Sequence, residues 1–168
     1  MPKIKIRYQQ VKDAKRFFEI LNNPNFIYLE IKVKSLAEEK EWLAKNLDRR
    51  KNNYEWNYTI LYGGKVVGAI GFKINQFRKY IGEIGYFIDE KYWGKGIASQ
   101  AVKLIEKEGF KKLGLKRMEI LMRPENKSSE KVAIKNGYKK EGLLKKCLKD
   151  KAGKLRDAWI YAKTFDIK

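Results

Sequence analysis

The sequence predicts an α/β (α+β) fold in a single domain over residues 1–168, with about seven strands and about four helices. A chain of 168 residues is long enough for one sizeable core and too short for two domains of typical size. Its residues are 43% apolar and 13% aromatic, which is enough to fill that core. Strand and helix patterns follow the order β α α β β β α β α β β, which predicts a mixed sheet covered by helices.

The first half of the chain begins with a strand and two helices. Residues 4–8 alternate apolar and basic side chains, which predicts a strand, and apolar residues at helical spacing predict a helix over residues 11–21. Ser35 and Glu38 form a capping-box pattern, in which a hydroxyl and a carboxylate bond free amides at a helix start. We therefore expect a second helix over residues 36–50.

The middle of the chain predicts a hairpin, a central strand and a long helix. Residues 55–62 and 65–73 are joined by Gly63-Gly64, a favoured two-residue hairpin connection. An apolar strand over residues 83–89 is followed by a glycine-bearing loop and a helical stripe over residues 96–113.

The last third predicts three strands and one short helix. A strand over residues 118–122 ends at a proline, and a helix over residues 128–136 ends at a glycine. Two further strands, over residues 138–148 and 155–165, are connected by a turn at residues 150–153.

Charge is the most unusual property of the composition. There are 39 Lys and Arg residues, 20 Asp and Glu residues and no His, so the formal net charge is +19 at pH 7. Residues 107–154 carry a net +10, about three times the density of the residues before them. Such charge suits phosphate in nucleic acid or in a small anionic ligand. The alternative, which we expect for most of these side chains, is a solvated Lys-rich surface set by genome composition or heat adaptation.

The same composition excludes several classes of protein. With no His and the single Cys147, a zinc site, a Cys–His pair and Ser–His chemistry are ruled out, and we expect no metal. The longest apolar runs, such as residues 66–72, are too short to span a membrane, and the first residues lack an apolar signal core. We therefore expect a cytoplasmic protein without a membrane partner.

The glycine-bearing loop, Tyr92-Trp93-Gly94-Lys95-Gly96-Ile97-Ala98, lies where a strand meets a helix. A helix start presents unpaired amides and partial positive charge, and the two glycines let an anion approach the backbone. The spacing is neither that of a Walker loop nor that of the dinucleotide fingerprint, because Ser99 stands where the third glycine would be. The loop thus predicts a pyrophosphate site, or alternatively a glycine-rich turn without a ligand.

An ordered series of motifs resembles the GNAT N-acetyltransferase superfamily, most closely its ribosomal-protein N-terminal (Rim-type) branch. The resemblance covers nearly the whole chain. Its motifs are Gly85-Tyr86-Phe87-Ile88, the glycine-bearing loop, Asn126-Lys127-Ser128-Ser129 with Val132, Lys135-Asn136-Gly137-Tyr138, and Glu141-Gly142-Leu143-Leu144.

The resemblance implies a mostly antiparallel sheet with a V-shaped splay, in which acetyl-CoA binds beside the strand over residues 83–89. Lys91 stands where the family usually has Gln or Arg, a departure that a loop acting through backbone amides should tolerate. The residues expected to bind the co-substrate are Phe87, Ile88, Trp93, Gly94, Lys95, Gly96, Ile97, Ala98, Asn126 and Lys135.

Acetyl transfer by direct attack needs a donor for the oxyanion, a proton source for the leaving sulfur and an acceptor for the amine's proton. The resemblance implies that a main-chain amide near Phe87 or Ile88 is the oxyanion donor. It places Ala133 where many members have a proton-donating Tyr, and Ser129 where the Rim-type branch has a Ser in that role. Asn126 would position the pantetheine arm. The alternative for Ser129 is a helix-capping hydroxyl.

The general base is less defined by the motifs. Some Rim-type relatives carry a Glu where this chain has Leu148, which cannot accept a proton. Glu83 is the remaining carboxylate that the resemblance suggests, acting through a water, and the alternative is an exposed strand residue or an ion-pair partner.

The expected reaction is acetyl-CoA-dependent transfer of an acetyl group to a primary amine, with a protein N-terminal α-amine as the expected acceptor. At pH 7 about 10% of an α-amine but only about 0.04% of a Lys amine is neutral, a difference of about 3.5 kcal/mol. A basic surface should also repel polyamines and suit a workplace near ribosomal protein or RNA. The alternatives are a small-molecule amine acetyltransferase and a non-catalytic basic module that binds RNA or ribosomes. An edge strand near the C-terminus makes a homodimer a further candidate.

Overall fold

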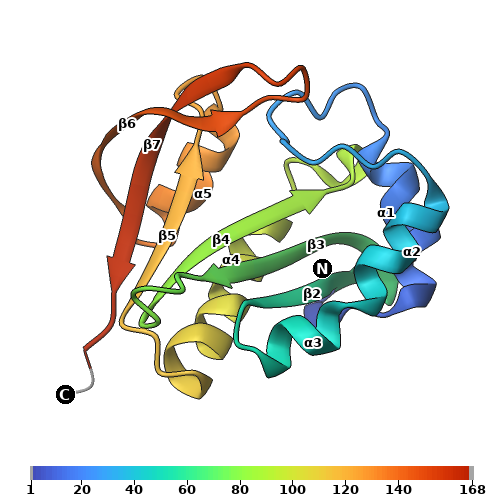
Figure 1. Cartoon of the computed structure of the whole chain (residues 1–168), viewed down its shortest axis with the longest axis horizontal. Coiled ribbons are helices and arrows are strands. Elements are labelled where there is room, and N and C mark those ends of the chain that lie inside the picture. Colours follow the sequence, from blue (N-terminus) through green and yellow to red (C-terminus); the bar gives the residue numbers. More distant parts are fainter. Residues whose placement is uncertain (1, 167–168) are drawn as a thin grey trace.

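A computed structural model describes residues 2–166, in which seven strands form one mixed sheet (Figure 1). The strand order is β1-β2-β3-β4-β5-β7-β6. All neighbouring strands are antiparallel except β4 and β5, which are parallel, so the predicted mixed and mostly antiparallel sheet is confirmed. The strands are β1 (Ile4–Tyr8), β2 (Glu55–Tyr62), β3 (Lys65–Ile74), β4 (Ile81–Ile88), β5 (Arg117–Met122), β6 (Lys139–Lys149) and β7 (Leu155–Thr164).

Helices cover both faces of the sheet. The first three lie on one face and α4 lies on the other (Figure 1). A π-helical turn at Lys107–Lys112 extends α4, and no helix within residues 2–166 is long and apolar enough to cross a membrane. The helices are α1 (Ala14–Leu21), α2 (Leu36–Ala44), α3 (Asn46–Lys51), α4 (Ile97–Glu106) and α5 (Lys127–Lys135).

The single helix predicted over residues 36–50 is instead two helices, α2 and α3. Its start agrees with the prediction, because the Ser35 hydroxyl accepts a hydrogen bond from the Glu38 amide at 3.1 Å. The helix breaks before Asn46, which is buried; its side chain donates to Gln9 at 2.8 Å and accepts from Asn57 at 3.1 Å. These tertiary contacts hold the chain against the sheet, and a periodicity argument cannot anticipate them.

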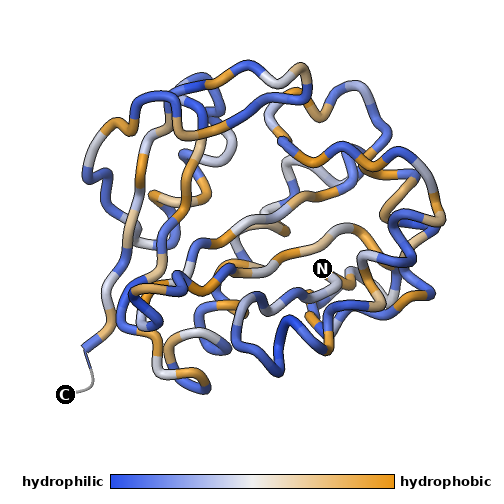
Figure 2. Tube along the Cα trace, in the orientation of Figure 1, coloured by the Kyte–Doolittle hydropathy of each residue, from blue (hydrophilic) through white to orange (hydrophobic). Residues whose placement is uncertain are grey.

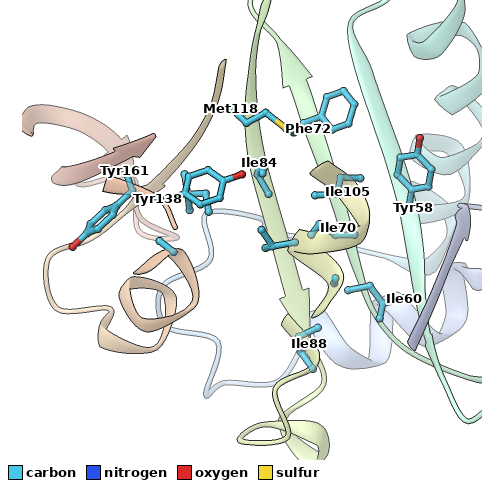
Figure 3. Packing of buried hydrophobic residues seen from close by; sticks show 14 of the residues in the cluster. Tyr58, Ile60, Ile70, Phe72, Ile84, Ile88, Ile105, Met118, Tyr138 and Tyr161 are labelled. Carbon is cyan, nitrogen blue, oxygen red and sulfur yellow. The ribbon is translucent and has the colours of Figure 1, made fainter. Parts of the chain in front are cut away.

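The larger hydrophobic core lies between the sheet and α4. Ile70 and Phe72 of β3, Ile84 of β4 and Ile105 of α4 point into it (Figure 3), and each is at most 3% exposed. Burying one such side chain contributes about 1.5–3 kcal/mol. Along the chain, hydrophobic residues recur on the strands, whereas the loops and α3 are largely hydrophilic (Figure 2).

The sheet opens between β4 and β5. Their pairing runs from Ile81–Arg117 to Ile84–Ile120 and then stops, although β4 continues to Ile88 and β5 to Met122. Figure 1 shows the two strands diverging, with the segment between α1 and α2 passing over the opening. The V-shaped splay that the family resemblance implied is therefore confirmed, and it positions the site described below.

Candidate active site

Two cavities meet at the splay. The loop cavity, about 640 Å³, lies against the glycine-bearing loop and α5. The carboxylate cavity, about 570 Å³, lies against β2, β3, β4 and α2. Six residues line both cavities, so a group bound in one can reach a group bound in the other: Tyr28, Leu29, Tyr86, Phe87, Asn126 and Ser129.

The glycine-bearing loop presents a row of unbonded amides. Gly94 and Gly96 have φ of 73° and 71°, values that favour glycine, and Gly96 is the N-cap of α4. The first helical amide to bond back is that of Gln100, which donates to the Gly96 carbonyl at 3.1 Å. Within the described residues the six amides of residues 94–99 have no hydrogen-bond acceptor. Such a set of amides at a helix start fits an anion.

Side chains hold this loop against the end of β4. The buried Asp89 carboxylate bonds to Arg16 of α1 and accepts from the Lys91 amide at 3.1 Å. The Trp93 indole donates to the Ile88 carbonyl at 2.7 Å. The loop is thereby fixed before any ligand binds.

Most of the residues predicted to bind the co-substrate line the loop cavity. Ile88, Trp93, Gly94, Gly96, Ile97 and Ala98 lie along the strand end and the loop, and Lys135 lies on α5. Phe87 and Asn126 lie where the two cavities meet. Lys95 does not line the cavity, and its ammonium lies 5.1 Å from the centre of the Tyr92 ring.

The two candidate oxyanion amides differ in direction. The amide of Asp89 donates to the Val67 carbonyl of β3 at 2.8 Å. Because amide directions alternate along a strand, the Phe87 amide also faces β3, whereas the Ile88 amide faces the side from which β5 has diverged. Only the Ile88 amide is thus directed into the splay.

Ser129 is held at the junction of the cavities by two neighbours. The N-cap of α5 is Asn126, whose side-chain oxygen accepts from the Ser129 amide at 3.2 Å. The interpretation of Ser129 as the helix cap is therefore wrong, and its hydroxyl is free for another role. That hydroxyl accepts a hydrogen bond from the Tyr86 hydroxyl at 3.2 Å.

Tyr86 is a residue of this site that the sequence reasoning missed. It lies on β4, and burial raises the pKa of its hydroxyl, which keeps it protonated as a donor. The available signal was strand alternation, which places the Tyr86 and Ile88 side chains on the same face of β4, the face that packs toward α4. The contact to Ser129 joins residues 43 positions apart and could not be derived from spacing.

Glu83 lies on β4 in the carboxylate cavity, away from the loop cavity. Glu83 is an exposed strand residue at the open side of this cavity, as the alternative reading of its position expected. The protein around it still desolvates the carboxyl in part, which raises its pKa; the positive charge of Lys73 lowers this pKa and the negative charge of Glu119 raises it further. Lys73 approaches Glu55 at 4.0 Å, and the described residues contain no ion-pair partner for Glu83. A carboxylate with a raised pKa is suited to accept a proton near neutral pH.

The carboxylate cavity is acidic although the chain carries a charge of +19. Its wall contains five glutamates, Glu30, Glu38, Glu39, Glu55 and Glu83, and three basic residues, Lys32, Lys73 and Arg123. The local charge at this cavity therefore has the opposite sign to the net charge of the chain, so the net charge alone does not predict whether a cationic acceptor is repelled here.

The sequence matches one family model and several known proteins. The acetyltransferase (GNAT) domain model matches residues 3–139. The "Ribosomal-protein-serine acetyltransferase" of Escherichia coli (strain K12) is 29% identical over 168 residues, covering 97% of this chain and 88% of that protein. The "Uncharacterized N-acetyltransferase p20" of Bacillus licheniformis is 38% identical over 98 residues, 58% of this chain, and the match spans about half of that protein, 54%.

A solved structure shares the fold. The microcin C7 self-immunity acetyltransferase MccE, in complex with acetyl-CoA and AMP, has a TM-score of 0.86 and 25% sequence identity to this chain. The likeness covers 97% of this chain and 93% of that one.

Proposed function

This chain belongs to the acetyltransferase (GNAT) family, and we propose that residues 1–168 form one catalytic domain that acetylates the α-amine of a protein N-terminus. As a member of this family it is an N-acetyltransferase, and its co-substrate is acetyl-CoA. The observation that carries the proposal is the junction at which Ser129 borders both the loop cavity and the carboxylate cavity.

The residues of the loop cavity fit acetyl-CoA. The free amides of residues 94–99 would hold its pyrophosphate, and Lys131 and Lys135 of α5 would add positive charge at the rim. Lys127 of the same helix pairs with Glu130 at 3.1 Å and lies outside the cavity wall. Asn126 would orient the arm that reaches the junction.

The remaining residues supply the steps of transfer. Acetyl-CoA supplies an acetyl thioester, whose carbonyl carbon is attacked by a neutral amine. The Ile88 amide, directed into the splay, would stabilise the oxyanion. Ser129 would donate a proton to the departing sulfur, and Glu83 would accept the amine's proton through a water in the carboxylate cavity.

Two observations support an α-amine as the acceptor. Deprotonating an α-amine at pH 7 costs about 3.5 kcal/mol less than deprotonating a Lys amine, which suits a site whose only candidate base is a carboxylate. Gly71 and Gly85 are paired across β3 and β4 and both line the carboxylate cavity; the Asn57 side chain lies over Gly71, whereas the floor at Gly85 is backbone without a side chain above it. An extended peptide can lie on such a floor.

We place the enzyme in the cytoplasm, near ribosomal proteins, in keeping with the relative that acts on a ribosomal protein.

The proposal is tested by a panel of acceptors. Release of CoA is measured with peptides that differ in their N-terminal residue, with the same peptides blocked at the N-terminus, and with spermidine and an aminoglycoside. We expect turnover with free N-termini and none with blocked peptides. Equal turnover of blocked peptides that carry an internal Lys would refute the α-amine assignment.

A further inference from the structure

Glu39 is a feature of the carboxylate cavity that the transfer reaction does not require. The residue lies in the first turn of α2, its side chain lines the cavity, and the residue is only 6% exposed. Among the described residues no hydrogen-bond donor or cation affects its carboxylate, whose surroundings are the cavity and the neighbouring carboxylate of Glu38.

The other glutamates of this cavity have an assigned partner or role. Glu30 accepts from the Lys149 amide at 3.2 Å, and Glu38 accepts from the Lys34 amide at 2.6 Å. Glu55 accepts from the Asn57 side chain at 3.1 Å, and Glu83 is the proposed base. Glu39 alone is buried at the cavity wall without either.

An unpaired buried carboxylate is unfavourable unless a ligand compensates it. Burial raises the pKa of Glu39, and the neighbouring carboxylate of Glu38 raises it further. The start of α2 carries partial positive charge, which partly stabilises the ionised Glu39 carboxylate. A cation that enters the cavity would balance the rest of its negative charge.

We propose that Glu39 is a subsite for a second positive charge on the acceptor, a basic side chain close to the amine that is acetylated. This inference rests on the proposed function and deepens it. A cavity of about 570 Å³ has a linear dimension of roughly 8 Å, the length of two to three extended residues. The basic side chain therefore belongs to the second or third residue of the acceptor.

The test compares kcat/KM for peptides that carry Lys, Ala or Glu at the second and third positions. The wild-type enzyme is expected to prefer the Lys peptide to the Ala peptide by about tenfold, the size of one charge-assisted contact, and to use the Glu peptide least. In Glu39→Gln the Lys-to-Ala ratio should fall to about 1. The matched control is Glu41→Gln on the same helix, whose carboxylate pairs with Lys45 at 3.1 Å outside the cavity wall; there the wild-type ratio should persist.

Three outcomes decide the inference. Equal use of the three peptides by the wild-type enzyme, or an unchanged Lys-to-Ala ratio in Glu39→Gln, overturns it. Since the first of these needs no variant, the test holds even where Glu39→Gln does not fold. If no peptide is acetylated but spermidine is, and its kcat/KM drops in Glu39→Gln, the cation subsite is supported while the α-amine assignment fails.

Discussion

Two hydroxyl groups meet where the cavities join, and their order of donation matters for catalysis. Because Tyr86 donates to Ser129, the hydrogen of the Ser129 hydroxyl is left for another acceptor. The proposed acceptor is the sulfur that leaves the acetyl group. Tyr86 is thus a positioning residue, which acts through Ser129.

Removing the Ser129 hydroxyl should affect turnover more than binding. We expect Ser129→Ala to lower kcat about 100-fold, the lower range for loss of a general acid, and to change the Kd of CoA less than about threefold. Tyr86→Phe should lower kcat about threefold to tenfold, as expected for one neutral hydrogen bond. An assay of CoA release gives kcat, and calorimetric titration gives the Kd of CoA.

The double variant separates positioning from a second, independent role. If Tyr86 acts only through Ser129, Tyr86→Phe should cost nothing further in the Ser129→Ala background. Additive losses, or an unchanged kcat in Ser129→Ala alone, would contradict the assignment.

Glu83 predicts a pH dependence of turnover. A base must be deprotonated to act, so kcat at saturating acceptor should rise with pH through the pKa of Glu83, which partial desolvation raises above that of an ordinary glutamate. Glu83→Gln should lower kcat and remove this limb from the profile. A limb that persists in Glu83→Gln would belong to another group and would exclude Glu83 as the base.

At the residue scale, the motifs predicted the place of Asn126 and Ser129 at the start of a helix, and the structure brings both residues to the junction of the cavities. Their catalytic roles stay predictions, and the hydrogen bond from the Ser129 amide to Asn126 was not anticipated. Tyr86 and Glu39 could not be identified from the sequence. Tyr86 matters through its contact with the distant Ser129, and Glu39 through its burial in the folded chain. The direction of the Ile88 amide likewise required knowing where β5 leaves β4.

At the scale of elements, the paired glycines of β3 and β4 determine the shape of the carboxylate cavity. A Cβ on Gly71 would lie 2.3 Å from the Asn57 side-chain oxygen, so that position has no room. A Cβ on Gly85 would meet no heavy atom within 4 Å, which means that it would enter the cavity.

Filling this space should block the acceptor selectively. We expect Gly85→Leu to raise the KM for a peptide acceptor at least about tenfold, because a buried Leu side chain occupies the floor on which the peptide would lie. Acetyl-CoA should bind as before, since Gly85 does not line the loop cavity. Equal losses of acceptor and acetyl-CoA binding would indicate that the two cavities do not divide the substrates in this way.

Element boundaries were largely predictable because hydrophobic periodicity and turn residues mark them. The hairpin at Gly63-Gly64 and the strands on either side agree with the structure. The break between α2 and α3 was not predictable, because the polar contacts of Asn46 with distant residues produce it. Local sequence contains no proline or glycine at that point.

At the scale of the whole molecule, net charge is a poor guide to either cavity. The chain carries +19, yet five glutamates line the carboxylate cavity, and the loop cavity is built mainly from uncharged amides. Composition alone left nucleic acid, a small anionic ligand and a solvated Lys-rich surface open, whereas the arrangement of backbone amides and glutamates is the basis for the proposed CoA site and the proposed cationic acceptor.

The central claim is that the backbone amides of residues 94–99 bind the pyrophosphate of acetyl-CoA beside the splay between β4 and β5. Its most direct test is the rise in melting temperature that acetyl-CoA causes, measured in wild type, Gly96→Glu and Gly114→Glu. At 100 times its Kd, the ligand should stabilise the wild type by about 2.7 kcal/mol, or roughly 5–10 °C. Gly114 has the same φ of 71° as Gly96 and lies outside the loop cavity, so it matches the charge and backbone strain of the substitution. We predict that the rise is lost in Gly96→Glu and kept in Gly114→Glu; a normal rise in Gly96→Glu would contradict the account.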